Sequence, residues 1–250
     1  MAPAGPLLER DDLTRGMELC RALNFEPVLG AFAGRHYGYL AGNDEERLAD
    51  LNAALGDPAI DAVWCLRGGY GVTRILDRVD FAALARRPKP VIGFSDITAL
   101  LNAVVREAGV VTFHGPMARA GLSRFSREHL LRLVSVSPDP SRAISLDRVP
   151  PPADFLVSPR HRIATLHPGT AEGPLAGGNL SLLQCLLGTR YFPDLEGAIL
   201  FLEDVGEELY RVDRMLAHLR LAGALDQLAG VMVGQFTDLK RGGESGALGF

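Results

Sequence analysis

Residues 90–98 read PVIGFSDIT, and the expected fold can be built outward from this stretch. Its first half is a short apolar run of strand length, and residues 97–107 follow with the apolar spacing of a helix. Similar apolar runs occupy residues 62–66 before it and residues 110–113 after it. Strands that alternate with helices in this way are typical of a parallel α/β sheet covered on both faces.

The composition changes between residues 137 and 159, where prolines stand among polar residues. Such a stretch is typical of a linker. We therefore expect an N-terminal α/β domain over residues 1–140, a linker over residues 141–160 and a smaller C-terminal α/β domain over residues 161–250.

The C-terminal part shows the same alternation of apolar runs and helical spacing. Strands are expected at residues 163–166, 198–202 and 231–233, and helices at residues 180–187 and 210–221. Residues 168–178 are rich in glycine and proline, which predicts turns.

Composition excludes several classes of protein. The 250 residues are 47% hydrophobic, and 26 Lys and Arg against 30 Asp and Glu give a net charge of -4. A nucleic-acid-binding domain usually carries a strongly basic surface, and a membrane span needs about 20 apolar residues in a row. The start of the chain lacks the pattern of a signal peptide, and the three cysteines lack metal-ligand spacing. We expect a cytoplasmic protein with no nucleic-acid or membrane partner and no metal.

Functional residue types follow each of the three expected N-terminal strands. Residues 67–71 read RGGYG, residues 95–96 are Ser-Asp, and residues 114–116 are His-Gly-Pro. The carboxyl ends of parallel strands meet at one edge of the sheet, where open α/β sheets bind ligands. The sequence therefore predicts a site at this edge.

Ser95 lies between an expected strand and an expected helix. A serine on such a turn resembles a nucleophile elbow, which exposes the hydroxyl beside the free N–H groups of the first helical turn. Ile97 stands where the hydrolase elbow has a second glycine. The alternative interpretation is that Ser95 only caps the helix.

The loop before Ser95 in the chain also allows two interpretations. Gly68, Gly69 and Gly71 can form an anion-binding cradle of backbone N–H groups or a plain tight turn. Arg67 can pair with a substrate carboxylate or lie on the surface as an ordinary charged residue.

Acids and histidines supply the remaining candidates. Glu203 and Asp204 end an apolar run, so one of them is expected to be partly buried. That acid can orient a histidine, as in a serine triad, or it can form a structural cap or ion pair. Among the histidines only His114 stands at the predicted edge, and a lone histidine is more often structural than catalytic.

Six motifs, taken together and in this order, resemble the LD-carboxypeptidase family, which also contains the microcin C immunity-type serine peptidases. They are APAGP at 2–6, RGGYG at 67–71, GFSDIT at 93–98, FHGPM at 113–117, GGNLS at 177–181 and FLED at 201–204. The similarity covers nearly the whole chain.

The resemblance implies a flavodoxin-like N-terminal domain, a smaller C-terminal α/β domain and a Ser-Glu-His triad in that chain order. By motif, Ser95 is the nucleophile and Glu203 the acid that orients the histidine. The implied reaction releases the terminal D-alanine of murein tetrapeptide, in peptidoglycan recycling, by cleavage of an L,D peptide bond. The alternative within the family is hydrolysis of peptidyl-aminoacyl nucleotides.

The resemblance also implies the other parts of the site. Gly68, Gly69 and the backbone N–H of Asp96 would form the oxyanion hole, and Arg67 and Tyr70 are the candidate substrate-binding residues. No metal or organic cofactor is implied. The expected partner is a small peptide substrate, and the family often forms homodimers.

The sequence departs from the family in one respect that matters for activity. The family's triad histidine lies in a Gly-His motif beyond the strand that ends at residues 234–237, and no histidine follows His218 here. The strand that precedes the family's first motif is also missing. We therefore expect a chain truncated at both ends that is weakly active or is an inactive ligand-binding remnant. His114 belongs to a different motif and is not expected to replace the missing base.

Overall fold

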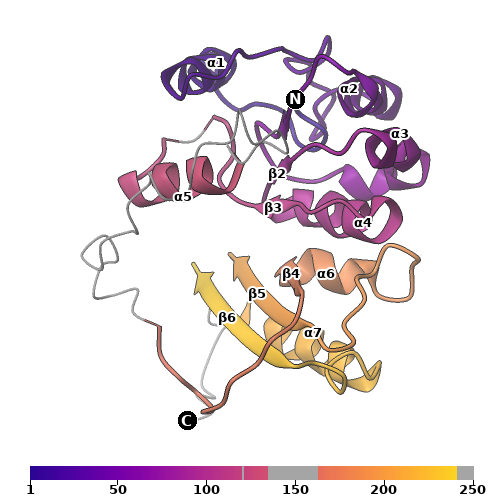
Figure 1. Ribbon diagram of the computed structural model, residues 1–250, viewed down its shortest axis with the longest axis vertical. Coiled ribbons are helices and arrows are strands. Elements are labelled where there is room, and N and C mark those ends of the chain that lie inside the picture. Colours follow the sequence, from indigo (N-terminus) through magenta and orange to yellow (C-terminus); the bar gives the residue numbers. More distant parts are fainter. Residues whose placement is uncertain (120, 135–162, 241–250) are drawn as a thin grey trace.

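The computed structural model describes residues 1–119, 121–134 and 163–240, and it contains two parallel β-sheets of three strands each. The sheets belong to two α/β units that lie one above the other in Figure 1. The expected fold class is thus confirmed. The expected linker at residues 141–160 lies outside the described residues.

The first sheet has the order β1-β2-β3, with β1 at Val63–Trp64, β2 at Val91–Gly93 and β3 at Phe113–His114. Helix α4 (Thr98–Ala108) connects β2 to β3, and seven of its eleven residues are buried. Gly109, with a φ of 65°, ends α4 in the left-handed conformation that glycine adopts without a steric penalty. The buried apolar residues of α4, β1 and β2 pack together in one core.

The other helices of this unit surround the sheet (Figure 1). They are α1 (Asp12–Ala22), α2 (Asp44–Gly56), α3 (Phe81–Arg86), α5 (Arg124–Val134) and the 3₁₀ turns η1 (Val72–Arg74), η2 (Leu76–Arg78) and η3 (Ser95–Ile97). The side chains of Asn43 and Glu46 form a capping box that starts α2. No helix within the described ranges is long and apolar enough to cross a membrane.

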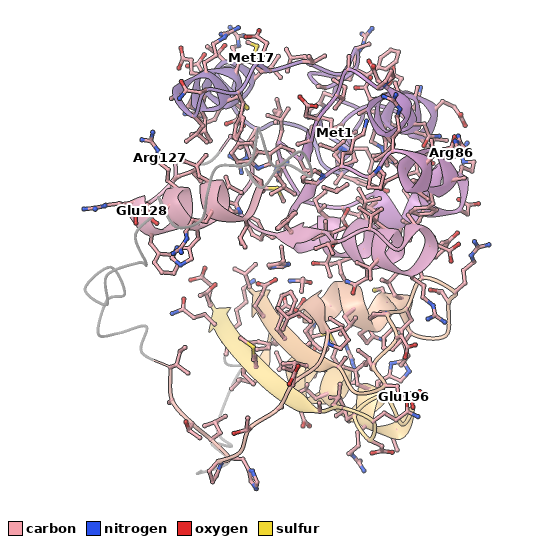
Figure 2. All side chains as sticks on the ribbon, viewed as in Figure 1. Met1, Met17, Arg86, Arg127, Glu128 and Glu196 are labelled. Carbon is pink, nitrogen blue, oxygen red and sulfur yellow. The ribbon has the colours of Figure 1, made fainter. Side chains whose placement is uncertain are left out.

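The first residues of the chain run beside β1. The Met1 ammonium group donates to the Trp64 carbonyl, and the Leu66 and Gly5 N–H groups donate to the Met1 and Gly68 carbonyls. Met1 lies among the side chains of the unit's interior in Figure 2. These bonds hold the start of the chain against the loop that follows β1.

The second sheet has the order β4-β5-β6, with β4 at Leu175–Asn179, β5 at Ile199–Val205 and β6 at Gly230–Thr237. Helices α6 (Leu180–Leu186) and α7 (Leu209–Leu221) pack on it around a separate apolar core. The strands expected at 198–202 and 231–233 and the two expected helices are confirmed.

Two expectations for the C-terminal part are wrong. Residues 163–166 form no strand, and Ile163 is 97% exposed. An apolar run forms a strand only where a neighbouring strand pairs with it. The glycine-rich region expected to be turns contains β4. A Cβ on Gly177 would lie 2.0 Å from the Phe201 carbonyl oxygen, so a glycine at this position permits the close approach of β4 and β5.

The two units meet where β4 approaches the start of α4. The Asn102 amide donates to the carbonyls of Thr98 and Gly177, at 2.8 and 2.9 Å, and the Asn179 N–H donates to the Thr98 hydroxyl at 3.1 Å. A Cβ on Gly178 would lie 2.8 Å from the Thr98 methyl carbon. These buried hydrogen bonds place the carboxyl end of β5 near the start of α4.

We expect Gly177→Ala to destabilise the protein much more than Gly188→Ala. Both glycines have a positive φ, of 123° and 84°, so alanine is strained at both by about 1–2 kcal/mol. Only at position 177 does the new methyl group also collide with backbone, whereas nothing lies within 4 Å at position 188. Urea unfolding should show a further loss of at least about 2 kcal/mol for Gly177→Ala. Equal losses would contradict the steric account.

Candidate active site

Ser95 starts the turn between β2 and α4 with a φ of 59°, a left-handed conformation rare for a residue other than glycine. A Cβ on Gly93 would lie 2.8 Å from the Cγ2 of Ile97, so Gly93 leaves room for this buried isoleucine. The predicted sharp turn is therefore present, and Ile97 is accommodated in place of a second glycine. Strained residues of this kind persist where the surrounding packing fixes them, often at functional sites.

The backbone of Gly68 lies directly against Ser95. A Cβ on Gly68 would stand 3.1 Å from the Ser95 hydroxyl oxygen and 3.4 Å from the Asp96 backbone nitrogen. Within the part of the chain that the structure describes, the Ser95 hydroxyl forms no hydrogen bond. The glycine therefore leaves open space beside the hydroxyl and the Asp96 N–H, and two of the predicted loops are brought together.

Two buried charged side chains hold the backbone of the loop around Gly68 in place. The Arg47 guanidinium donates to the carbonyls of Pro3 and Gly71, at 2.5 and 2.8 Å. The Asp96 carboxylate accepts from the Val72 N–H at 2.9 Å. Both side chains are almost fully buried, so they fix the loop's backbone and do not face solvent.

Burial raises the pKa of the Asp96 carboxyl from 3.8 to about 6. Among the described residues its Oδ1 atom has no hydrogen-bond partner, and the hydrogen bond from Val72 and the charge of Arg47 only partly offset the burial. The side chain of Asp96 is therefore a structural tether for the glycine loop. Its backbone N–H is the part that faces the candidate site.

The two candidate substrate-binding residues differ in environment. Arg67 donates to the carbonyl oxygen of Pro6, and burial followed by repulsion from Arg119 lowers its pKa. Tyr70 is 47% exposed, and its ring lies 5.7 Å from that of Tyr39. The guanidinium of Arg67 thus supports the chain's own backbone, whereas the ring of Tyr70 is accessible from solvent.

His114 and Glu203 face each other across the junction of the two units. Their Nε2 and Oε1 atoms are 3.6 Å apart, and the side chains are 21% and 23% exposed. In the register of β2 and β3, His114 pairs with Gly93, and Gly93 lies two residues before Ser95 in the chain. The third predicted loop is therefore also brought to the site, and Glu203 joins it from the second sheet.

Burial shifts both groups toward their neutral forms. It lowers the pKa of His114 to about 4, so the imidazole is uncharged at pH 7. Burial, and then the charge of Asp204, raise the pKa of Glu203. The facing Oε1 of Glu203 and the Nδ1 of His114 are buried and, among the described residues, have no hydrogen-bond partner.

Asp204 has a different role from its neighbour. Its carboxylate accepts from the Asn179 amide at 2.9 Å and from the Ser181 N–H and hydroxyl at 3.0 and 2.7 Å. Of the two acids at the end of the apolar run, Asp204 is thus the structural one and Glu203 is the one left available. Sequence reasoning did not assign Asn179 and Ser181, although the GGNLS motif that contains them was visible.

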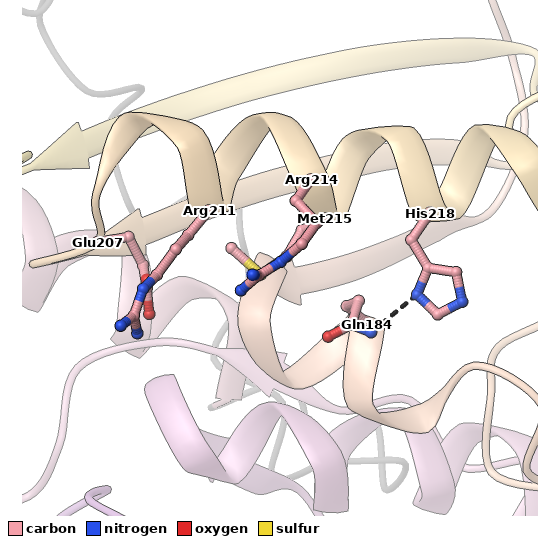
Figure 3. Close-up of a pocket in the computed structure, with 6 residues that line it drawn as sticks. All are labelled: Gln184, Glu207, Arg211, Arg214, Met215 and His218. Carbon is pink, nitrogen blue, oxygen red and sulfur yellow. Dashed lines mark hydrogen bonds between the residues drawn. The ribbon is translucent and has the colours of Figure 1, made fainter. Parts of the chain in front are cut away.

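A separate pocket of about 310 Å³ lies between α6 and α7 (Figure 3). It is lined by Gln184, Glu207, Arg211, Arg214, Met215 and His218. The Gln184 amide and the His218 Nδ1 are hydrogen-bonded at 2.8 Å. None of the predicted site residues lines this pocket. No group of three His, Cys, Asp or Glu that could hold a metal occurs in the described ranges.

Models of two domains match this chain. The LD-carboxypeptidase N-terminal domain matches residues 1–115, and the LD-carboxypeptidase C-terminal domain matches residues 172–247. These matches, with the two parallel sheets, define a serine-type carboxypeptidase. The chain belongs to the LD-carboxypeptidase family, as its motifs predicted.

Relatives and solved structures agree with this assignment. A relative from Streptomyces coelicolor is 43% identical over 94% of this chain and 73% of its own length. The murein tetrapeptide carboxypeptidase of Pseudomonas aeruginosa is 42% identical over 85% of this chain and 68% of its own. The structure of muramoyltetrapeptide carboxypeptidase from Oxalobacter formigenes has a TM-score of 0.78 and 33% identity, with 97% of this chain and 77% of that chain covered. The microcin C7 self-immunity protein MccF also has a TM-score of 0.78, over 96% of this chain and 77% of its own, but at 22% identity it shows the fold alone.

We expect Asp96→Asn to change the pH dependence of stability. The folded-state pKa of about 6 lies above the ordinary 3.8, so the folded state binds this proton more tightly than the unfolded chain. The resulting stabilisation is complete below pH 3.8 and is lost as the pH rises through about 6. The free energy of unfolding, measured in urea from pH 4 to 8, should therefore increasingly favour the Asn variant from pH 4 to about pH 6, and the difference should then level off. A variant-to-parent difference that stays constant with pH would contradict this.

Proposed function

We propose that this chain hydrolyses the L,D peptide bond that releases the terminal D-alanine from murein tetrapeptide. Ser95 is the nucleophile and Glu203 the acid of the triad. The observation that carries the proposal is the strained turn that presents the Ser95 hydroxyl beside Gly68 and the Asp96 N–H. The name of the 42% identical Pseudomonas aeruginosa relative supports the substrate.

In this reaction the Ser95 hydroxyl oxygen attacks the carbonyl carbon of the scissile bond. The backbone N–H of Asp96 and the loop of Gly68 and Gly69 stabilise the resulting oxyanion. Collapse of the tetrahedral intermediate breaks the C–N bond, and D-alanine leaves with a proton on its amine. Water then attacks the acyl-enzyme and frees Ser95.

The proton transfers require a histidine as general base and then general acid. The family resemblance puts this residue in a Gly-His motif that residues 1–250 do not contain, and Glu203 would orient it. Tyr70, whose ring is exposed to solvent, would contact the bound substrate. Arg67 would act mainly by fixing the backbone around the glycine loop. The reaction would serve peptidoglycan recycling in the cytoplasm.

We expect residues 1–250 by themselves to release D-alanine slowly, and Ser95→Ala to abolish the release. Removing one member of a serine triad commonly lowers the rate by about 10⁴ or more. Chromatography of D-alanine from murein tetrapeptide measures the rate. The control is Ser123→Ala, at an exposed residue that directly precedes α5.

A longer chain that includes the Gly-His motif should restore the rate. A peptidyl-aminoacyl nucleotide serves as the comparison substrate on that longer chain. Faster hydrolysis of the nucleotide than of the tetrapeptide would contradict the proposed substrate. Release of D-alanine that survives Ser95→Ala would contradict the proposed nucleophile.

We expect Gly68→Ala to lower kcat about 10²–10³-fold with little change in Tm, because the new methyl group would occupy the space beside the Ser95 hydroxyl and the Asp96 N–H. The matched control is Gly121→Ala, where nothing lies within 4 Å of the added Cβ. Both variants are assayed on the longer chain, against calorimetric Tm values. Equal kcat values for the two variants would argue against an oxyanion hole at Gly68.

A further inference from the structure

We propose that His114 is a positioning residue that holds the Glu203 carboxylate through a hydrogen bond from its Nε2–H group. The contact itself stands independently of the reaction, and its importance for catalysis rests on the proposed function. His114 is distinct from the triad histidine, since it comes from β3 and a different motif.

The ring of His114 is held on three sides. The Phe94 and Phe201 rings meet it edge-on, with centroids 6.2 and 5.2 Å away. A Cβ on Gly178 would lie only 3.1 Å from its Nδ1. This packing limits the movement of the ring, and its Nε2 lies 3.6 Å from the Oε1 of Glu203.

The proton of a neutral imidazole resides on one of the two ring nitrogens. Nδ1 is buried and has no hydrogen-bond partner among the described residues, whereas Nε2 faces the Oε1 of Glu203, which also has none. A proton on Nε2 therefore gives the carboxylate a donor. A proton on Nδ1 would instead leave two lone pairs facing each other.

The distance of 3.6 Å is about half an ångström longer than a formed hydrogen bond. Hydrogen bonds of catalytic groups are often long in the free enzyme and tighten when substrate binds. Because the imidazole is packed in place, a small movement of the flexible Glu203 side chain closes the gap.

Among the described residues, no other group donates to the Oε1 of Glu203. Asp204, the next residue on β5, repels the charge of Glu203. The Asn179 amide of β4 stabilises the charged form, but Asn179 also donates to Asp204. Thr98 at the start of α4 accepts from the Asn179 N–H and is uncharged. His114 is thus the neutral donor that faces the unpartnered oxygen.

Three substitutions separate the donor from the packing. His114→Gln places an amide N–H near the position of Nε2, so the contact is retained. His114→Asn places its amide near Nδ1 and cannot reach Glu203. His114→Phe keeps a ring in the aromatic slot but has no donor. If the larger ring is not tolerated beside Gly178, the smaller Asn variant still removes the donor.

The test is a pH titration of the Glu203 carboxyl by NMR, with glutamate labelled with ¹³C at the side-chain carboxyl and the signal assigned from Glu203→Gln. Because a hydrogen bond to the charged form lowers a carboxyl pKa, the Phe and Asn variants should raise the Glu203 pKa by about one unit. The Gln variant should titrate like the parent protein. The control is His129→Gln on α5, where the ring packs on Phe125, and it should leave Glu203 unchanged.

A Glu203 pKa that is the same in the parent, Phe and Asn variants would overturn the inference. On the longer, active chain the Phe and Asn variants should lower kcat at least tenfold with KM unchanged, and Gln should restore it. If Glu203 shifts as expected but Ser95→Ala leaves D-alanine release intact, the contact stands and the proposed function fails. If D-alanine release depends on Ser95 but Glu203 does not shift, the proposed function stands and this inference fails.

Discussion

The arrangement of the site depends on how closely the backbone of β4 approaches the start of α4. Gly177 and Gly178 have no side chains to keep Phe201 and Thr98 away, and hydrogen bonds from Asn102 and Asn179 fix the approach. Because α4 follows directly on the Ser95 turn and β5 pairs with β4, this contact helps to set where Glu203 stands relative to the first sheet. Glu203 of the second sheet thereby lies beside His114 of the first.

The acids near this junction divide into two kinds. Asp96 and Asp204 are nearly inaccessible, and their oxygens accept hydrogen bonds that hold the glycine loop and the start of α6. Glu203 is only partly buried, and one of its oxygens has no partner among the described residues. An unpaired buried oxygen costs stability, and the Oδ1 of Asp96 is a second example among the described residues. Glu203 differs from Asp96 because its unpartnered oxygen faces the ring of His114 and its side chain is partly exposed.

Local patterns in the sequence predicted the features that depend on neighbours in the chain. The strand and helix around Ser95, the strand at 198–202 and the helices α6 and α7 all follow from apolar spacing. The strand β4 was missed because its glycines read locally as turns, and only the neighbouring Phe201 and Thr98 explain them. The contact of His114 with Glu203 joins residues 89 positions apart on two sheets, so no spacing rule contains it.

The electrostatics of the junction explain why an uncharged histidine suits this position. A protonated imidazole beside Glu203 would form a buried ion pair and would keep the carboxylate fully charged at neutral pH. Burial instead lowers the pKa of His114 to about 4, so at neutral pH the ring offers a hydrogen bond and no charge. Burial, and then the charge of Asp204, raise the pKa of Glu203, and the uncharged ring adds no positive charge that would offset the carboxylate. The acid of a triad uses its negative charge to stabilise the imidazolium formed during catalysis.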